Sequence, residues 1–189
     1  QGDWEGRRAV ALREVSPLLV RAVLATEDAR FFKHHGIDYV GIGRALIANL
    51  QSGQVRQGGS TLTQQLMKNF FLSSERTYQR KLHEIAMALV AEQEYSKERI
   101  LEAYLNEIYL AQRGSRGVYG VAEASRFFFG KDPSELTAGE AAMIAGLIRA
   151  PSAYSPRRYP ERARQRRDTV LRLLYEAGDI DHDTFDRER

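Results

Sequence analysis

The chain has 189 residues, of which 43% are apolar and 28% charged, a composition typical of a globular domain with a hydrophobic core. It contains no cysteine, which excludes disulfide bonds and thiolate metal sites, and a net charge of +3 does not by itself indicate a nucleic-acid partner. The longest apolar run, 141–148, is far shorter than the ~20 residues that cross a bilayer, so we expect a soluble piece of a longer protein whose anchor lies outside it.

Helix signals follow one another along the chain, and no alternating strand pattern of useful length interrupts them. Residues 1–16 are interpreted as a connector that ends in a Ser-Pro helix start. Helices are predicted at 17–28, 39–51, 60–72, 75–95, 97–110, 160–178 and after 181. A further helix is predicted to end at 129–130, and two more are predicted to start within 132–135 and 137–140. The N-caps of three of them are expected to be Asp38, Ser73-Ser74 and Ser96. Loops are expected at 52–59, 112–117 and 150–156, and the predicted fold class is mainly α, with one domain over 17–189.

The stretch 25–36 concentrates two adjacent carboxylates, two phenylalanines, two histidines and a glycine. Glu27 and Asp28 fall at the C-terminal end of the first predicted helix, where the helix dipole does not stabilise an anion. That position suits Glu27 for taking up a proton. The alternative is a polar helix end with an aromatic plug behind it, and the stretch alone gives the two interpretations equal weight.

Residues 58–69 place two glycines before a polar helix start. Such glycines let backbone N–H groups converge on an anion at the positive end of a helix. Thr61, Gln65 and Lys68 are spaced i, i+4 and i+7, which puts a hydroxyl, an amide and an ammonium on one helical face. A solvated face normally carries Lys and Glu instead, so the pattern favours a phosphate-bearing or sugar substrate. It is not a Walker loop.

In the stretch 80–84, Glu84 follows Arg80 by four residues and Lys81 by three, so the three share one helical surface. On a solvated surface this trio would be a set of ion pairs worth about 0.3–0.5 kcal/mol each. In a cleft it would instead offer two cations and a carboxylate to a leaving pyrophosphate. His83-Glu84 also begins a zinc-protease motif, but Met87 stands where the second histidine is required, which argues against a zinc site.

The segment 149–172 contains eight arginines, against the two carboxylates of Glu161 and Asp168. Contact with anionic lipid would gain about 1 kcal/mol per cation near a membrane surface. A solvated helix face is the simpler interpretation of this segment. The aromatic residues that alternate with cations in single-strand nucleic-acid grooves are missing, so we expect no nucleic-acid partner.

Together these stretches resemble the family-51 glycosyltransferases, the peptidoglycan transglycosylase domains of bacteria. The first three family motifs are Glu-Asp-x-x-Phe-x-x-His-x-Gly, Gly-x-Ser-Thr-x-Thr-Gln-Gln and Arg-Lys-x-x-Glu. Five motifs occur here in the family's order, at 27–36, 58–65, 80–84, 97–106 and 116–130. The resemblance covers nearly all of 17–178, and the stretches 70–76 and 106–110 are most similar to the bifunctional class A penicillin-binding proteins.

The resemblance implies a peptidoglycan glycosyltransferase that polymerises lipid II into β-1,4 glycan, with inversion and release of undecaprenyl pyrophosphate. It implies that Glu27 is the general base on the acceptor hydroxyl. It also implies that Glu84 assists the leaving pyrophosphate, directly or through a divalent cation such as Mg²⁺. The substrate-binding residues that it implies are Asp28, Phe31, His34, Ser60, Thr61, Gln64, Gln65, Lys68, Asn69, Arg80, Lys81, Tyr104, Asn106 and Ser152.

The fold implied by the resemblance is a lysozyme-like multi-helix domain with a small jaw, at about 37–75, that dips into the membrane. The apolar helix at 39–50 is the candidate for this jaw, with ordinary core packing as the alternative. A transmembrane anchor and a transpeptidase domain are expected outside this sequence, and the catalytic domain is expected on the outer, periplasmic face of the bacterial inner membrane. Expected partners are lipid II, the growing lipid-linked glycan, the membrane surface and phosphoglycolipid inhibitors of the moenomycin type.

Two other functions stay open at this point. A lysozyme-like hydrolase would cleave finished glycan, with its two carboxylates ~5 Å apart if it is retaining and farther apart, around a water, if it is inverting. An inactive module would only bind membrane or glycan, which the intact Glu27, Glu84, Lys68 and Arg80 argue against. The size of the product made from lipid II separates polymerisation from hydrolysis.

Overall fold

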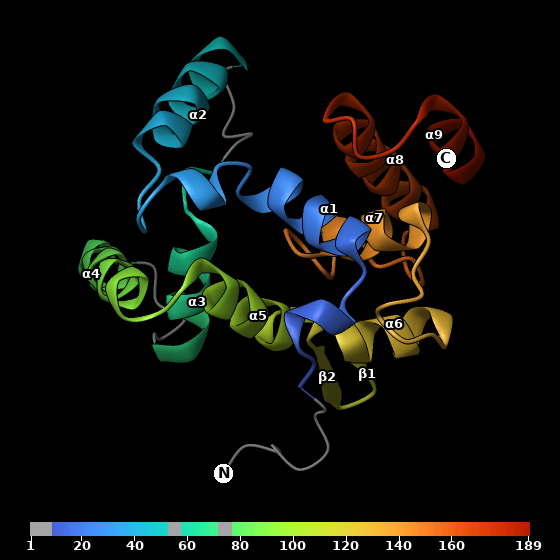
Figure 1. Cartoon of the computed structure of the whole chain (residues 1–189), viewed down its shortest axis with the longest axis horizontal. Coiled ribbons are helices and arrows are strands. Elements are labelled where there is room, and N and C mark those ends of the chain that lie inside the picture. Colours follow the sequence, from blue (N-terminus) through green and yellow to red (C-terminus); the bar gives the residue numbers. More distant parts are fainter. Residues whose placement is uncertain (1–8, 53–57, 72–76) are drawn as a thin grey trace. The chain divides into compact units, whose positions relative to one another are not determined.

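The computed structural model describes residues 9–52, 58–71 and 77–189, and helices dominate this part of the chain (Figure 1). The α-helices are α1 (Pro17–Glu27), α2 (Tyr39–Ser52), α3 (Leu62–Phe71), α4 (Tyr78–Glu94), α5 (Lys97–Glu107), α6 (Val121–Phe129), α7 (Ala138–Leu147), α8 (Pro160–Glu176) and α9 (His182–Glu188). Two strands, β1 (Tyr109–Arg113) and β2 (Arg116–Tyr119), and two short 3-10 helices, Leu12–Glu14 and Phe31–Lys33, complete the described elements. The predicted mainly α fold class is confirmed.

The chain divides into two compact units. Unit 1 comprises Gln1–Glu27 and Leu105–Arg189, and unit 2 comprises Asp28–Tyr104. The first motif is therefore divided between the units, with Glu27 as the last residue of one segment and Asp28 as the first residue of the next. The predicted jaw, 37–75, falls within unit 2, and its boundaries stay a prediction.

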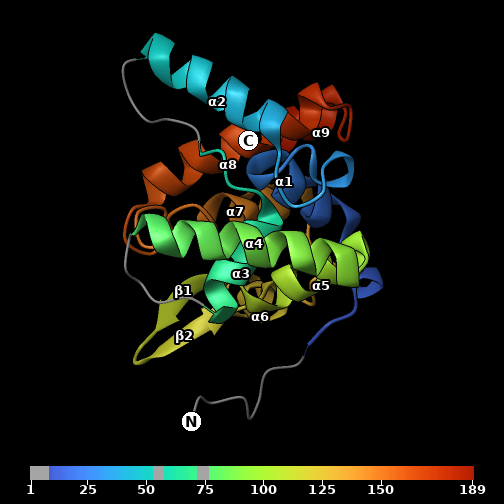
Figure 2. The same cartoon turned by 90° about the vertical axis from the view of Figure 1, so that its left-hand side faces the viewer.

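Helix α7 forms the centre of unit 1, where α1 and α8 pack against it (Figures 1 and 2). It is apolar on nearly all sides, which is typical of a helix that neighbours cover completely. Its small residues allow close approach, since a Cβ on Gly146 would lie 3.0 Å from Cγ of Arg166 on α8. Thr137 and Glu140 form the capping box predicted for its start, with the Thr137 side chain accepting from the Glu140 N–H.

In unit 2, α3 packs against α4. The turn that ends the first motif also lies directly on α4, because a Cβ on Gly36 would be 3.2 Å from the backbone carbonyl group of Ala88. Gly36 has φ +90°, a conformation that a side chain disfavours. A glycine at this position therefore serves both the turn and the close approach to the helix.

Helix α2 begins after the predicted N-cap, Asp38, and exposes most of its apolar surface. Its exposed large apolar residues are Tyr39, Val40, Ile42, Leu46, Ile47 and Leu50. Leu50 is 73% exposed and Tyr39 is 77% exposed, so ordinary core packing, the alternative for this helix, is wrong for these side chains. None of the helices in the described ranges combines the length and the apolar character that crossing a bilayer requires.

The hairpin of β1 and β2 corrects two sequence predictions: a helix that continues to 110 and a plain loop at 112–117. The two strands pair antiparallel across a two-residue turn, in which Gly114 has φ +60°. The rings of Tyr109 and Tyr119 pack against each other across the two strands, with their centroids 5.4 Å apart. The sequence of β1 shows no period of two, since Tyr109, Leu110 and Ala111 are apolar in succession, and the register shifts between Tyr109 and Ala111.

Most other helix boundaries lie within two residues of their predicted positions. The start of α3 is Leu62 instead of residue 60, and α4 begins after Thr77, whose side chain accepts from the N–H of Arg80. The predicted cap at Ser73-Ser74 lies outside the described residues. The predicted helix start at 132–135 is wrong. The N–H of Asp132 donates to the Glu135 carboxylate, as in a capping box, but no helix follows and these residues form a turn.

Candidate active site

A buried carboxylate joins the first motif to the second. The Asp28 carboxylate accepts a hydrogen bond from His34 Nε2 at 2.8 Å and another from the backbone N–H of Leu62 at 2.9 Å. The two side chains of the Asp28–His34 pair are only 3% and 4% exposed. Because Leu62 is the first residue of α3, the carboxylate lies at the positive end of that helix. Nδ1 of His34 accepts from the N–H of Gly36 at 3.2 Å, which makes Nε2 the protonated nitrogen.

Thr61 and Gln64 close the start of α3 by a reciprocal capping arrangement. The backbone N–H of each residue donates to the side-chain oxygen of the other, at 3.2 Å in both cases. The Thr61 hydroxyl also donates to the carbonyl oxygen of Gly36 at 2.7 Å. Both residues are at most 2% exposed, so Thr61 does not share an open face with Gln65 and Lys68 as its spacing predicted. These contacts favour a helix-positioning part for Thr61 and Gln64.

Lys81 joins the second motif to the third. Its ammonium donates to the Ser60 hydroxyl at 2.7 Å and to Oε1 of Glu84 at 2.5 Å. The Glu84 side chain is 4% exposed, whereas the Lys81 side chain is 39% exposed. The part of this group that solvent reaches is therefore the Lys81 side chain. Arg80, half-buried on the same helix, completes the predicted trio.

The last turns of α3 carry accessible polar side chains. Lys68 and Asn69 are both exposed, and no ion pair holds Lys68 within the ranges that the structure describes. Gln65, one turn earlier, is half-buried, and its Oε1 accepts from the hydroxyl of Tyr104 at 3.0 Å. Tyr104 itself is fully buried, so it positions Gln65 and does not contact solvent.

A second buried network surrounds Phe31 and was missed by sequence reasoning. The Glu92 carboxylate accepts from the Thr63 hydroxyl at 2.6 Å and from the Lys97 ammonium at 2.7 Å. The same ammonium lies 4.4 Å from the centroid of the Phe31 ring, which is 1% exposed. Phe31, predicted to bind substrate, is thus part of the interior of unit 2. The residues of this network belong to different elements, so local periodicity gave no signal for it.

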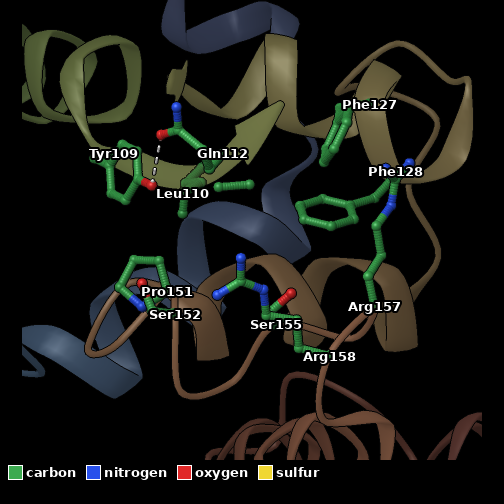
Figure 3. A pocket seen from close by; sticks show the side chains of 11 residues that line it. Tyr109, Leu110, Gln112, Phe127, Phe128, Pro151, Ser152, Ser155, Arg157 and Arg158 are labelled. Atoms are coloured by element: carbon green, nitrogen blue, oxygen red, sulfur yellow. Dashed lines mark hydrogen bonds between the residues drawn. The ribbon is translucent and has the colours of Figure 1, made fainter. Parts of the chain in front are cut away.

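Three predicted site residues lie in unit 1. Glu27 is half-buried at the last position of α1, as predicted. Asn106 exchanges two hydrogen bonds of 2.9 Å with the backbone of Val10, which favours anchoring of that segment over substrate contact. Ser152 is exposed and lines a pocket of about 240 Å³ (Figure 3).

A divalent cation beside Glu84 would require six or more oxygen ligands from protein, substrate and water. The carboxylate oxygen Oε1 of Glu84 is already in contact with the Lys81 ammonium, which repels a second cation. Within the described ranges, His, Cys, Asp and Glu side chains nowhere gather in a group of three that would hold a metal. These residues do not fit a cation held by the protein, so the chemistry proposed below rests on side chains alone.

Comparison with known proteins gives a consistent picture. The family model described as Transglycosylase matches residues 1–175. Penicillin-binding protein 1B of Haemophilus influenzae is 51% identical over 176 residues, which is 93% of this chain and 22% of the relative. Penicillin-binding protein 1B of Vibrio cholerae is 54% identical over 175 residues, which is 92% of this chain and 22% of the relative. Penicillin-binding protein 1A of Escherichia coli is 48% identical over 183 residues, which is 97% of this chain and 21% of the relative.

A similar fold occurs in the crystal structure of penicillin-binding protein 1A from Haemophilus influenzae. The TM-score is 0.56 at 28% sequence identity, over 96% of this chain and 17% of that chain. The likeness confirms the predicted transglycosylase fold. The chain spans about a fifth of the length of these relatives. With the family model matched over residues 1–175 of 189, the chain belongs to the transglycosylase family.

Proposed function

We propose that this chain is a peptidoglycan glycosyltransferase domain that polymerises lipid II. The observation that carries the proposal is the contact of Ser60, Lys81 and Glu84, which brings the ammonium of a partly exposed lysine and a buried carboxylate together from two motifs of a transglycosylase. Relatives to which the chain is similar are named penicillin-binding proteins. A cation held by a buried acid suits a site where negative charge develops on a leaving group.

In the proposed reaction, the carboxylate of Glu27 takes the proton from the 4-hydroxyl of the acceptor sugar. The oxygen attacks the anomeric carbon of the donor, and the bond from that carbon to the phosphate oxygen breaks with inversion. The electron pair stays on undecaprenyl pyrophosphate, whose charge Lys81, Arg80 and Lys68 stabilise. Glu84 holds the Lys81 ammonium in place. The Glu27 proton is then lost to solvent, which restores the base.

The proposal includes contact with the outer face of the cytoplasmic membrane, where a lipid-linked substrate resides. The exposed apolar side chains of α2 support it, since a soluble surface rarely carries a large contiguous apolar patch without a binding partner. A phosphoglycolipid of the moenomycin type combines a phosphate with a lipid, and we expect it to compete for the site of the donor. Assistance of the leaving pyrophosphate by a divalent ion stays a prediction.

The test is turnover of labelled lipid II in detergent by the chain itself and by Glu27→Gln. We expect the wild type to make long glycan and the variant to be slower by about 10²–10⁴-fold with an unchanged melting temperature. Glu176→Gln is the matched control, because Glu176 is the last residue of α8 as Glu27 is of α1, and it is expected to keep full activity.

Three results would contradict the proposal. A wild-type chain that degrades finished glycan and leaves lipid II monomeric would be a hydrolase. A folded wild-type chain with neither activity would be a binding module. Equal rates for Glu27→Gln and Glu176→Gln would remove Glu27 from the chemistry.

A further inference from the structure

Unit 1 contains a pocket that the reaction described above does not use. It has a volume of about 240 Å³ and lies between the hairpin, the aromatic end of α6 and the loop that precedes α8 (Figure 3). Pockets for drug-sized ligands have volumes of ~300–1,000 Å³, so this one has room for one sugar ring or the end of a short peptide. Two adjacent arginines, Arg157 and Arg158, line it.

The charge of the pocket is one-sided. None of the described residues that line it is acidic, and neither arginine is ion-paired within the described part of the chain. The Arg157 guanidinium lies 4.3 Å from the centroid of the Phe127 ring, and this stacking fixes it against the aromatic wall. In Figure 3 the Arg158 side chain extends toward the middle of the pocket. A planar guanidinium in this position suits an oxyanion, which it binds with two parallel hydrogen bonds.

Hydrogen bonds hold several of the other polar groups of the pocket in place. The backbone N–H of Arg158 donates to the carbonyl oxygen of Ser155 at 3.1 Å, which closes a turn under the arginine. The Tyr109 hydroxyl donates to Gln112 Oε1 at 3.2 Å, and Gln112 Nε2 donates to the carbonyl oxygen of Gly114 at 3.1 Å. These bonds leave the Ser152 and Ser155 hydroxyls on the lining as adaptable donors. The arginine cation, the serine hydroxyls and the aromatic wall together suit a small organic anion.

We propose that this pocket binds a carboxylate of the peptide that the sugar of the substrate bears, with Arg158 as the principal contact. The proposal rests on the function proposed above, which supplies two kinds of oxyanion: the pyrophosphate and the peptide carboxylates. Lys68, Arg80 and Lys81 of unit 2 are assigned to the pyrophosphate. The pocket in unit 1 has an aromatic wall that a bare phosphate does not require, so the carboxylate of a short organic chain fits it better.

The experiment is calorimetric titration of the whole chain with three soluble probes. The probes are an N-acetylmuramyl dipeptide that ends in D-glutamate, the same compound with its carboxylates amidated, and inorganic pyrophosphate. Each is titrated into the wild type, Arg158→Gln and Arg158→Lys. Arg164→Gln is the matched control, because it removes an exposed arginine of α8 that does not line the pocket. Circular dichroism verifies that all four proteins are folded.

We expect Arg158→Gln to weaken binding of the acidic dipeptide roughly tenfold or more. Arg158→Lys should fall between this variant and the wild type, and Arg164→Gln should leave the affinity unchanged. The amidated probe should bind weakly to all four proteins. Equal affinities of Arg158→Gln and Arg164→Gln for the acidic dipeptide, or no binding of it by the wild type, would overturn the proposal. A loss confined to pyrophosphate would overturn the assignment to a carboxylate. Since no turnover is measured, these outcomes are separate from the test of lipid II polymerisation.

Discussion

Unit 2 contains two acid–base pairs that have similar N···O distances but differ in their exposure to solvent. In the buried pair, Asp28–His34, both side chains are at most 4% exposed. In the open pair, Lys81–Glu84, the acid is 4% exposed but the lysine is 39% exposed. A hydrogen-bonded pair whose partners are both buried fixes structure, because neither partner can turn to water or to a ligand. A lysine side chain that stays partly exposed while a buried carboxylate holds its ammonium can meet an anionic substrate, so we expect the two pairs to differ in what they do.

The contacts of the two pairs agree with this division. Asp28 and His34 bind the backbone N–H groups of Leu62 and Gly36, which are fixed parts of the fold. Lys81 instead binds the side chain of Ser60, which can give way to a ligand. The predicted site residues thus divide into those that support α3 and those that face solvent. Four predictions break or sharpen this comparison.

The largest effect is expected from Asp28→Ala. The substitution leaves the imidazole of His34 and the N–H of Leu62 without their acceptor in the interior, which should cost about 3–5 kcal/mol of unfolding free energy. Urea unfolding followed by circular dichroism measures it. Asp28→Asn is the control, because its amide oxygen still accepts from both groups, and it should lose much less. A loss under about 1 kcal/mol for Asp28→Ala would mean that the buried pair does not hold the fold.

Glu84→Gln should produce the opposite profile. The free energy of unfolding should change by less than about 1 kcal/mol, because the Lys81 side chain can turn to water when its acid is neutralised. Turnover of lipid II should fall by about 10²–10³-fold, since the ammonium is no longer held where the leaving charge develops. Steady-state rates and urea unfolding on the same preparation measure the two quantities. A strongly destabilised variant would place Glu84 with the buried pair.

Lys68→Ala sharpens the comparison within α3, whose start is buried and whose last turns are exposed. We expect about tenfold weaker binding of a moenomycin-type phosphoglycolipid and an unchanged melting temperature, because one charge-assisted contact is lost. Lys33→Ala, which removes another exposed lysine of unit 2, is the control. Calorimetry on both variants decides the point, and equal affinities would exclude Lys68 from the donor site.

The smallest effect concerns Asp38, the N-cap of α2. Burial alone would raise the pKa of Asp38, but the N–H of Gly41 and the Arg30 guanidinium at 3.1 Å outweigh burial and hold this pKa below its ordinary value of 3.8. A lowered pKa in the folded state means that the carboxylate adds stability above pH 3.8, and that this stability is lost as the pH falls through the lower folded value.

Asp38→Asn keeps the cap but removes this titration. We expect a loss of about 1 kcal/mol or less at neutral pH, and the difference from the wild type should shrink as the pH is lowered beneath 3.8. Thermal unfolding at a series of pH values measures it. A difference that stays constant with pH would show that the charge of Asp38 contributes nothing.

The sequence predicted the helical class, most helix positions and the family, because these depend on local periodicity, capping residues and motif order. It did not distinguish scaffold from site within a motif. Asp28 follows Glu27 directly, and Thr61 shares a motif with Gln65, yet Asp28 and Thr61 are buried while Glu27 and Gln65 are half-buried. Burial depends on which distant elements cover a residue, and a motif carries no record of that.

The same limit explains the contacts that sequence reasoning missed. Thr63, Glu92 and Lys97 meet from three helices, and Asn106 pairs with the backbone of Val10, a partner 96 positions away. Every residue except proline carries the same backbone donor and acceptor, so no side-chain pattern identifies such partners. The hairpin was missed for a different reason, since β1 begins with three apolar residues in succession and so does not alternate apolar with polar residues.

The central claim is that the open pair acts on the substrate while the buried pair only supports the fold. Its most direct test is the rate of lipid II polymerisation per folded molecule, measured for Asp28→Asn and Glu84→Gln in one detergent, with the folded fraction taken from circular dichroism. Asp28→Asn should retain a rate within a few-fold of the wild type, and Glu84→Gln should lose at least about 10²-fold. If Glu84→Gln polymerises lipid II as fast per folded molecule as Asp28→Asn, the open pair is not part of the active site.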